Sequence, residues 1–139
     1  MDSRFLVAYD RSSLGDFAVE EGLRMAKEAG AGLYVLGLGG EPAPGTPGWG
    51  LSQQDRLHED LISIFHLGQR LGVDVDGSVP TQPTIADVRG VIRAENISRV
   101  VVARMRDDDQ SRDHWGRVLE SAATAEKVPV TVLSTDGAD

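Results

Sequence analysis

Residues 100–117 read Val-Val-Val-Ala-Arg-Met-Arg-Asp-Asp-Asp-Gln-Ser-Arg-Asp-His-Trp-Gly-Arg. A run of β-branched residues stops at Ala103, a highly charged segment follows, and an amphipathic pattern begins at Trp115. This order predicts a buried strand, a loop and a helix, with the loop at the carboxyl edge of a sheet. Ligands of α/β proteins bind at that edge, so this segment is a candidate binding loop.

Apolar runs of strand length alternate with helical patterns along the whole chain. The predicted strands are Arg4–Tyr9, Leu33–Leu38, Val73–Val79, Ile97–Ala103 and Val128–Leu133. Helices are predicted from Leu14 to Ala29 with Gly30 as terminator, from a Ser52 cap to the terminator Gly72, from a first turn containing Pro83 through Ile92, and from Trp115 through Ala122. Strands that alternate with helices require a mostly parallel sheet with right-handed crossovers and helices on both faces.

The sequence pattern also predicts which strands are central and which helix positions are buried. The unbroken apolar runs at Arg4–Tyr9 and Val100–Val102 indicate central strands, whereas the alternation in Val73–Val79 indicates an edge strand. The predicted buried helix positions are Ala18, Val19, Gly22, Leu23, Met25, Ala26 and Ala29, then Leu57, Leu61, Ile64, Phe65, Gly68 and Leu71, then Ile85, Val88 and Ile92, and finally Trp115, Val118, Leu119 and Ala122.

Composition restricts the class of protein and its partners. The 139 residues match one domain, 1–139, and the absence of cysteine argues against disulfides and thiolate metal sites. The net charge of −8 repels polyanions, so neither nucleic acid nor an anionic membrane is expected as a partner. The start of the chain lacks a signal-peptide pattern, and no apolar run has the length of a membrane span. A cytoplasmic location is therefore expected.

Two segments are predicted to be irregular. Residues 39–51 form an expected flexible loop, since three prolines and five glycines fall within 39–50, and residues 134–139 form an expected polar tail. Trp49 in the loop has two interpretations: it covers a ligand, or it anchors the loop to the body of the protein. We favour the second, because one aromatic side chain is a common anchor for a surface loop.

The sequence contains no pattern typical of a catalytic or metal site. His58 and His66 are two helical turns apart, too far to share one metal ion, and are expected on the surface. His114 lies next to Asp113, but no serine-centred elbow accompanies it. The acidic run 107–109 lacks the ligand spacing of a calcium loop and is interpreted as a solvated turn.

The whole chain resembles the universal stress protein family. Residues 6–12, Leu-Val-Ala-Tyr-Asp-Arg-Ser, look like the family's opening motif, in which the first strand ends in an aspartate followed by a small polar turn. The carboxyl-terminal part is similar too, with Gly-Arg-Val-Leu-Glu at 116–120 leading through a helix into Val-Pro-Val at 128–130. The resemblance extends over nearly all 139 residues in element order and length.

The family's nucleotide-binding signature is glycine, two residues, glycine, nine residues, glycine, then serine or threonine. With the third glycine placed on Gly116 the spacing fits without a gap, but Ala103, Arg106 and Arg117 replace the other three residues. A Cβ in a phosphate loop costs on the order of 1 kcal/mol before any clash with the ligand. The resemblance further matches Asp10 to the adenosine side of the site and Leu38 to the strand end that lies against the base. Ser12, in the turn after Asp10, is a further candidate residue of the nucleotide crevice. Asp10 also has a purely structural interpretation as the cap of the first helix.

The arginines of this segment leave two hypotheses open. Arg104, Arg106, Arg112 and Arg117 could bind phosphates, since arginine is a strong phosphate partner. Alternatively, the aspartates at 107–109 and 113 pair with them and the site has lost tight ATP binding, which we favour. A third hypothesis, an unrelated enzyme on the same fold, lacks any catalytic constellation in the sequence.

The resemblance implies one doubly wound five-stranded parallel sheet of order 3-2-1-4-5, Rossmann-like and similar to the adenine nucleotide alpha hydrolases. It also implies a homodimer through the last strand, where Val130, Thr131 and Val132 would form the interface. The predicted function is a non-enzymatic, dimeric stress-response protein that acts on an unknown protein partner, without a resident cofactor. The alternative is a member that binds ATP or another adenine nucleotide with Mg²⁺ through an arginine-modified loop and hydrolyses it slowly at most.

Overall fold

The computed structural model describes residues 3–10, 13–38, 49–80, 84–105 and 114–135. The elements are β1 (Arg4–Tyr9), α1 (Ser13–Ala29), β2 (Gly32–Gly37), α2 (Trp49–Leu71), β3 (Val75–Ser78), α3 (Ile85–Ala94), β4 (Ile97–Met105), α4 (His114–Ala125) and β5 (Val130–Thr135). Strands and helices alternate as the hydrophobic pattern predicts.

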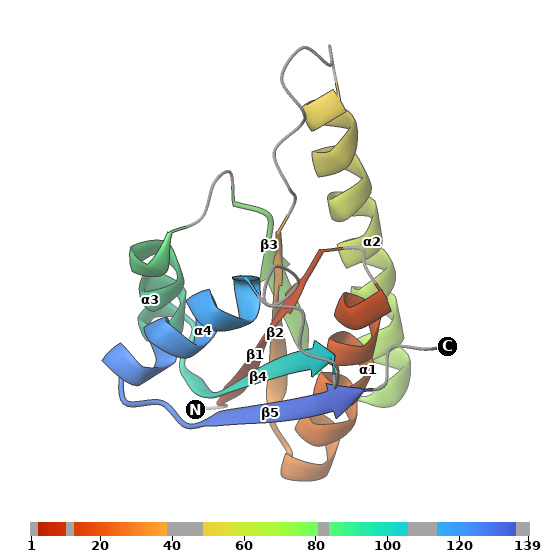
Figure 1. The fold of residues 1–139 in the computed structure, drawn as a ribbon. Helices are drawn as coiled ribbons and strands as arrows, with labels where there is room; N and C mark the ends of the chain where they lie inside the picture. The colour runs from red at the N-terminus through yellow and green to blue at the C-terminus, as the bar shows by residue number, and fades with distance from the viewer. Residues whose placement is uncertain (1–2, 11–12, 39–48, 81–83, 106–113, 136–139) are drawn as a thin grey trace.

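The five strands form one parallel sheet in the order β3-β2-β1-β4-β5. The predicted fold class and strand order are therefore confirmed. β3, with its alternating sequence, lies at one edge, and the apolar strands β1 and β4 lie in the interior (Figure 1). β1 is the point at which the order turns back, since its neighbours are β2 on one side and β4 on the other.

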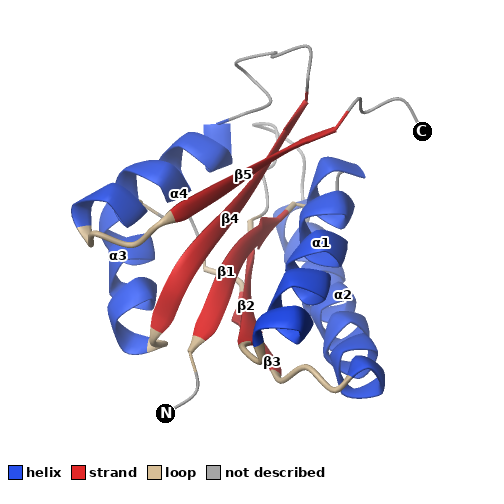
Figure 2. Cartoon of the chain, turned by 90° about the horizontal axis from the view of Figure 1, so that it is seen from below, coloured by secondary structure: helices blue, strands red, loops and turns tan. Residues whose placement is uncertain are grey.

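Two helices cover each face of the sheet, as Figure 2 shows. On the face of α1 and α2, Val7, Val35 and Val101 pack with helix residues such as Leu23 and Leu57. On the other face, strand residues including Leu6, Leu36 and Val100 pack with residues of α3 and α4. Because successive strand residues point to opposite faces, both Leu6 and Val7 are fully buried. This double burial explains the missing polar alternation in β1.

Two helix starts differ from the prediction. α2 begins at Trp49 rather than after a Ser52 cap, so the last residues of the predicted loop 39–51 are helical. α3 begins at Ile85 behind the cap Thr84, whose side chain accepts a hydrogen bond from the N–H of Asp87 at 3.2 Å. Pro83 therefore precedes the helix instead of lying in its first turn. The capping box between Thr84 and Asp87 fixes this start, because each side chain bonds to the backbone of the other.

Several predicted buried positions are exposed at helix ends. Ile85 is 44% exposed and Leu71 is 36% exposed, and Ala29 is exposed as well. Each lies in the first or last turn of its helix, beyond the part that the sheet covers. The remaining aliphatic positions that were predicted to be buried and whose side chains are described are buried or half-buried. The side chain of Trp115 lies outside the described residues.

The last strand is shifted along the chain relative to the prediction. β5 runs from Val130 to Thr135, so Ser134 and Thr135 of the predicted tail belong to the sheet. Pro129 comes directly before the strand, and its carbonyl accepts a hydrogen bond from the N–H of Val100 at 3.0 Å. Proline is tolerated there because the strand N–H groups that pair with β4 come later. β4 likewise extends two residues beyond Ala103, to Met105.

The helices α1 and α2 end in the same way at the amino edge of the sheet. Gly30 and Gly72 follow them with φ angles of 68° and 78°, the left-handed conformation that favours glycine. One residue further on, the N–H of Ala31 bonds to the carbonyl of Ala26, and the N–H of Val73 bonds to that of Gly68, each at 2.8 Å. Both glycines were predicted as helix terminators, and this backbone geometry confirms them.

Candidate functional site

The carboxyl edge of the sheet holds the predicted site. β1 and β4 are parallel neighbours, so the carboxyl ends of both strands, with Asp10 directly after β1, lie at the same edge (Figure 1). The chain leaves β1 toward α1 on one face and leaves β4 toward α4 on the other. A crevice is expected where two such connections diverge, which is the usual ligand position in open α/β sheets.

Asp10 is exposed and lies against the first turn of α1. A Cβ added at Gly15 would come within 2.9 Å of Asp10 Oδ1 and 3.1 Å of its backbone nitrogen, so only glycine fits there without a shift. Beside it, the hydroxyl of Tyr9 donates a hydrogen bond to Asp60 Oδ2 at 3.1 Å, which ties α2 to the end of β1. This packing is compatible with Asp10 as a helix cap and equally with Asp10 as a ligand contact.

Leu38 contributes to the edge through its backbone alone. Its side chain is fully buried in the core on the face of α3 and α4. Its N–H donates to the carbonyl of Tyr9 at 2.8 Å, which holds the end of β2 next to the end of β1. A ligand at this position would therefore touch main-chain atoms of Leu38 and no part of its side chain.

The other described members of the predicted site come from β4 and α4. Ala103 is half-buried near the end of β4, Gly116 is half-buried in the first turn of α4, and Arg117 is exposed on that turn. Leu119 is 1% exposed and anchors the helix in the core. Arg104 Nη2 lies 3.8 Å from Glu120 Oε2, so this ion pair links the end of β4 to α4.

The remaining predicted site residues lie outside the described residues. They are Ser12, Arg106, the acidic run 107–109, Arg112 and Asp113, and the side chains of Trp49 and His114. The structure thus brings the described positions, Asp10 and Leu38 on one side and Ala103 on the other, to one edge of the sheet. The roles of the arginines and aspartates of residues 106–113 in the crevice therefore stay predictions from the sequence.

The histidines of α2 lie where the sequence predicts them. His58 and His66 are both exposed. Within the segments that the structure describes, no group of three His, Cys, Asp or Glu side chains converges on a possible metal position. None of the helices in those segments has an apolar stretch long enough to cross a membrane.

Two pKa shifts have clear physical causes, and both arise from structural contacts. Hydrogen bonds from Arg93 and then Arg89 lower the pKa of Glu126 from 4.5 to about 2, at distances of 2.7 to 2.8 Å. This cluster joins α3 to the end of α4. Burial raises the pKa of Tyr34, while its hydrogen bond to Ser78 at 2.9 Å opposes that shift. Both groups act in packing between neighbouring elements.

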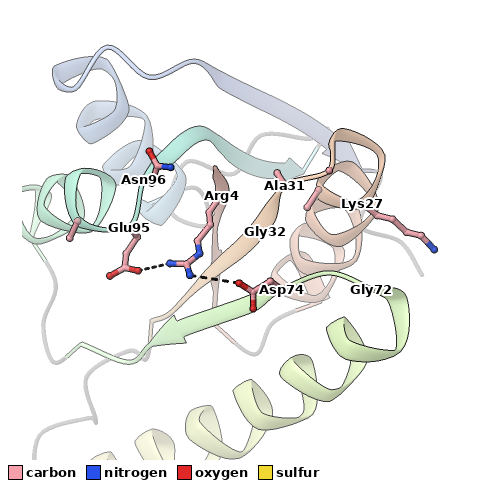
Figure 3. A pocket seen from close by; sticks show the side chains of 11 residues that line it. Arg4, Lys27, Ala31, Gly32, Gly72, Asp74, Glu95 and Asn96 are labelled. Atoms are coloured by element: carbon pink, nitrogen blue, oxygen red, sulfur yellow. Dashed lines mark hydrogen bonds and ion pairs between the residues drawn. The ribbon is translucent and has the colours of Figure 1, made fainter. Parts of the chain in front are cut away.

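A pocket that the sequence did not reveal lies at the opposite, amino edge of the sheet. It has a volume of about 500 Å³ and lies among the starts of β1 and β2 and the ends of α1, α2 and α3 (Figure 3). Its charged lining residues are Arg4, Lys27, Asp74 and Glu95. No local sequence pattern predicts it, because its walls come from four separate parts of the chain. We call it the amino-edge pocket.

Comparison with known proteins shows the fold of the chain. No protein-family model matches the sequence, and no curated protein matches it significantly. A universal stress protein family structure from Burkholderia pseudomallei aligns with a TM-score of 0.63 and 20% identity over 94% of this chain and 95% of that one. A universal stress protein family protein from Arabidopsis thaliana with AMP bound aligns with a TM-score of 0.59 and 15% identity over 99% of both chains. The chain therefore has the universal stress protein fold.

The same architecture also occurs in an enzyme. A deacetylase of teicoplanin biosynthesis, solved in complex with teicoplanin, aligns with a TM-score of 0.60 and 15% identity over 92% of this chain and 68% of that one. Fold similarity at this level leaves the activity to be argued from individual residues.

Proposed function

We propose that the chain is a universal stress protein that does not bind ATP tightly and acts, without catalysis, as a homodimer on a protein partner. The observation that supports this proposal most strongly is the set of residues at the carboxyl edge. Ala103 near the end of β4 and Arg117 in the first turn of α4 stand where the family's signature has glycine and serine or threonine. Only Gly116 of the four signature residues is retained.

The two described replacements act against phosphate binding by different means. Ala103 adds a Cβ at a point where the backbone would have to approach the phosphates closely. Arg117 removes a hydroxyl donor from the helix start, where free N–H groups otherwise form an anion site. The sequence adds Arg106 at the second glycine position, with aspartates beside it. We therefore infer that the fold is kept while tight ATP binding is lost.

The dimer proposal rests on the exposed edge of the sheet at β5. This strand pairs with β4 alone among the described strands, so no described strand bonds to the N–H and carbonyl groups of its other edge. Val132 is 42% exposed in the middle of it. An unprotected apolar strand edge is a hazard for aggregation, and antiparallel pairing with a second copy around a twofold axis would cover it. Val130, Thr131 and Val132 would then form the centre of the interface.

A second candidate function, binding of an adenine nucleotide with Mg²⁺, has one observation in its favour. Asp10 is exposed at the same edge as the end of β4, the arrangement that the fold offers for a nucleoside. The similar structure from Arabidopsis thaliana holds AMP. Under this proposal arginines of the loop would replace the glycine cradle as phosphate partners. The cytoplasmic location and the organisation of residues 1–139 as one domain stay predictions from the sequence.

Nucleotide content of the purified protein distinguishes the two functions. The full chain is purified at low salt, denatured, and the supernatant analysed by anion-exchange chromatography for adenine nucleotides. We expect no nucleotide above the level in a mock purification. Stoichiometric AMP, ADP or ATP would instead support the second function and contradict the first.

The oligomeric state tests the dimer separately. Sedimentation velocity of the wild-type chain should give a single dimeric species, whereas Val132→Lys should shift it to a monomer, because a charge would be buried at the strand pairing. The matched control is Ile62→Lys, at a 53% exposed position of α2, which should remain dimeric. A monomeric wild-type chain, or a dimer that Val132→Lys leaves intact, would contradict the β5 interface.

A further inference from the structure

The amino-edge pocket contains a guanidinium group held by carboxylates from two sides. Arg4 at the start of β1 donates a hydrogen bond through Nη1 to Glu95 Oε1 at 2.6 Å. Its Nη2 lies 3.8 Å from Asp74 Oδ2, and Nη1 lies 3.9 Å from Asp76 Oδ2 (Figure 3 shows the contacts with Glu95 and Asp74). The Glu95 contact is a close ion pair, whereas the two aspartates are only loosely engaged.

Asp74 is the carboxylate of this cluster that is most accessible to an added cation. Its side chain is 81% exposed, compared with 25% for Arg4 and 30% for Glu95. Asp76 is engaged on its other oxygen, which accepts from the N–H of Gly77 at 2.8 Å. Lys27, the other basic residue of the lining, extends away from Arg4 in Figure 3. The guanidinium of Arg4 thus faces three carboxylates, and Asp74 is the most exposed of the three.

The backbone adds negative potential from the same direction. The carboxyl ends of α1, α2 and α3 all lie at this edge, since Gly30, Gly72 and Ala94 line the pocket. Each helix end carries the equivalent of about half a negative charge on its last carbonyl groups. This contribution of the backbone favours a cationic ligand over an anionic one.

We propose that the amino-edge pocket binds a small organic cation with an ammonium or guanidinium group, which pairs with Asp74 beside Arg4. Arg4 itself illustrates the chemistry, because the chain's own guanidinium already occupies part of this site. The volume of about 500 Å³ is in the range of small-molecule sites. A metal ion is a poor alternative, since no group of three acidic or histidine ligands converges within the described residues. The proposal is independent of nucleotide binding at the carboxyl edge.

Agmatine, which carries both an ammonium and a guanidinium group, is a suitable probe. Isothermal titration of the full chain at low ionic strength should give saturable one-site binding that weakens as salt is added, because the attraction is screened. In two-dimensional ¹H–¹⁵N spectra, the largest shifts should fall on the amides of Gly30, Gly32 and Gly72. Because these three glycines line the pocket, their shifts show where agmatine binds, which the affinity alone does not show.

Three variants separate a built pocket from general attraction to an acidic protein. Asp74→Asn should weaken agmatine binding about two- to fivefold, as expected for one exposed ion pair. Ala94→Leu, at an exposed lining position of α3, should weaken it by occupying pocket volume without a change of charge. Glu59→Gln, on the exposed side of α2, changes the net charge by the same amount as Asp74→Asn and should leave binding unchanged.

Each result bears directly on the proposal. Saturable binding with shifts at the three glycines, reduced by Asp74→Asn and Ala94→Leu but not by Glu59→Gln, supports it. A titration that does not saturate overturns it. So does an equal loss in Glu59→Gln and Asp74→Asn, which would show attraction to net charge only. Circular dichroism of the variants verifies the fold, and Asp74 is exposed enough for its substitution to leave the fold intact.

Discussion

The two edges of the sheet differ in how their chemistry is arranged. At the carboxyl edge the fold offers a ligand position between β1 and β4, and we propose that Ala103, Arg106 and Arg117 replace the residues that would bind phosphate there. At the amino edge, helix ends and ion pairs surround a pocket of about 500 Å³ that the fold class does not predict. The fold therefore determines where a site can lie, whereas individual side chains determine which ligand fits it.

The geometry of the carboxyl edge depends on the packing of α4 against the core. The variant Leu119→Ala tests this packing and has the largest expected effect on stability. Leu119 is 1% exposed, so removing its side chain leaves a cavity and should cost about 2–5 kcal/mol of unfolding free energy. Urea denaturation followed by circular dichroism measures the change. Ile62→Ala, at a 53% exposed position, is the control and should stay within about 0.5 kcal/mol of wild type. Similar losses in both variants would mean that α4 is not anchored as described.

The amino edge depends on Arg4, and Arg4→Met should lower the unfolding free energy by about 1–3 kcal/mol. The variant leaves the half-buried Glu95 without its partner at 2.6 Å. The loss should shrink at high salt, because part of it is electrostatic. Arg24→Met is the matched control: Arg24 pairs with Glu21 and Glu28 on the surface of α1 and should matter less. An Arg24 effect as large as that of Arg4 would remove the distinction between the amino edge and ordinary surface pairs.

The sequence predicted the elements that have their own local signal. The strands β1 and β4 were predicted from unbroken apolar runs, and the helix ends at Gly30 and Gly72 from the conformational freedom of glycine. The predicted start of α2 was wrong. The glycines and prolines before the helix indicated a loop through residue 51, whereas the helix begins at Trp49. The prediction that Ile85 is buried was also wrong. This residue lies in the first turn of α3 and is exposed, whereas Val88 and Ile92 further along the helix are buried.

Contacts between distant parts of the chain had no local signal. Arg4 and Glu95 are 91 residues apart, and neither lies in a pattern that names the other. The amino-edge pocket was missed for the same reason. At the carboxyl edge the reverse holds: the resemblance located Asp10, Leu38 and Ala103 at one place, since the strand order alone brings their strand ends together.

Acid titration tests a second contact near the amino ends of the strands, with a smaller expected effect. The pKa of Glu126 is about 2 in the folded chain against an ordinary value of 4.5, so its ionised form is favoured by folding. The resulting stabilisation is complete above about pH 4.5 and is lost as the pH falls toward 2. Glu126→Gln should flatten the fall in the urea midpoint between pH 5 and pH 3, relative to Glu59→Gln. Identical pH profiles for the two variants would contradict the role of the Arg89 and Arg93 contacts.

The smallest expected effect is a gain of ligand binding at the carboxyl edge. The triple variant Ala103→Gly, Arg106→Gly, Arg117→Ser restores the family's signature residues at the spacing that the sequence retains. It should acquire weak ATP binding, because the backbone can then approach the phosphates and a hydroxyl returns to the helix start. Failure to gain any affinity, in a variant that is folded by circular dichroism, would show that the register through Gly116 is wrong or that other residues block the site.

Isothermal titration of the purified wild-type chain with ATP and Mg²⁺ tests the central claim most directly. The claim is that this chain keeps the universal stress protein fold while its carboxyl edge has lost tight nucleotide binding. We predict no saturable heat at ATP concentrations through the low micromolar range. Saturable one-site binding in that range would contradict the claim and favour the alternative, in which arginines of residues 104–117 bind the phosphates.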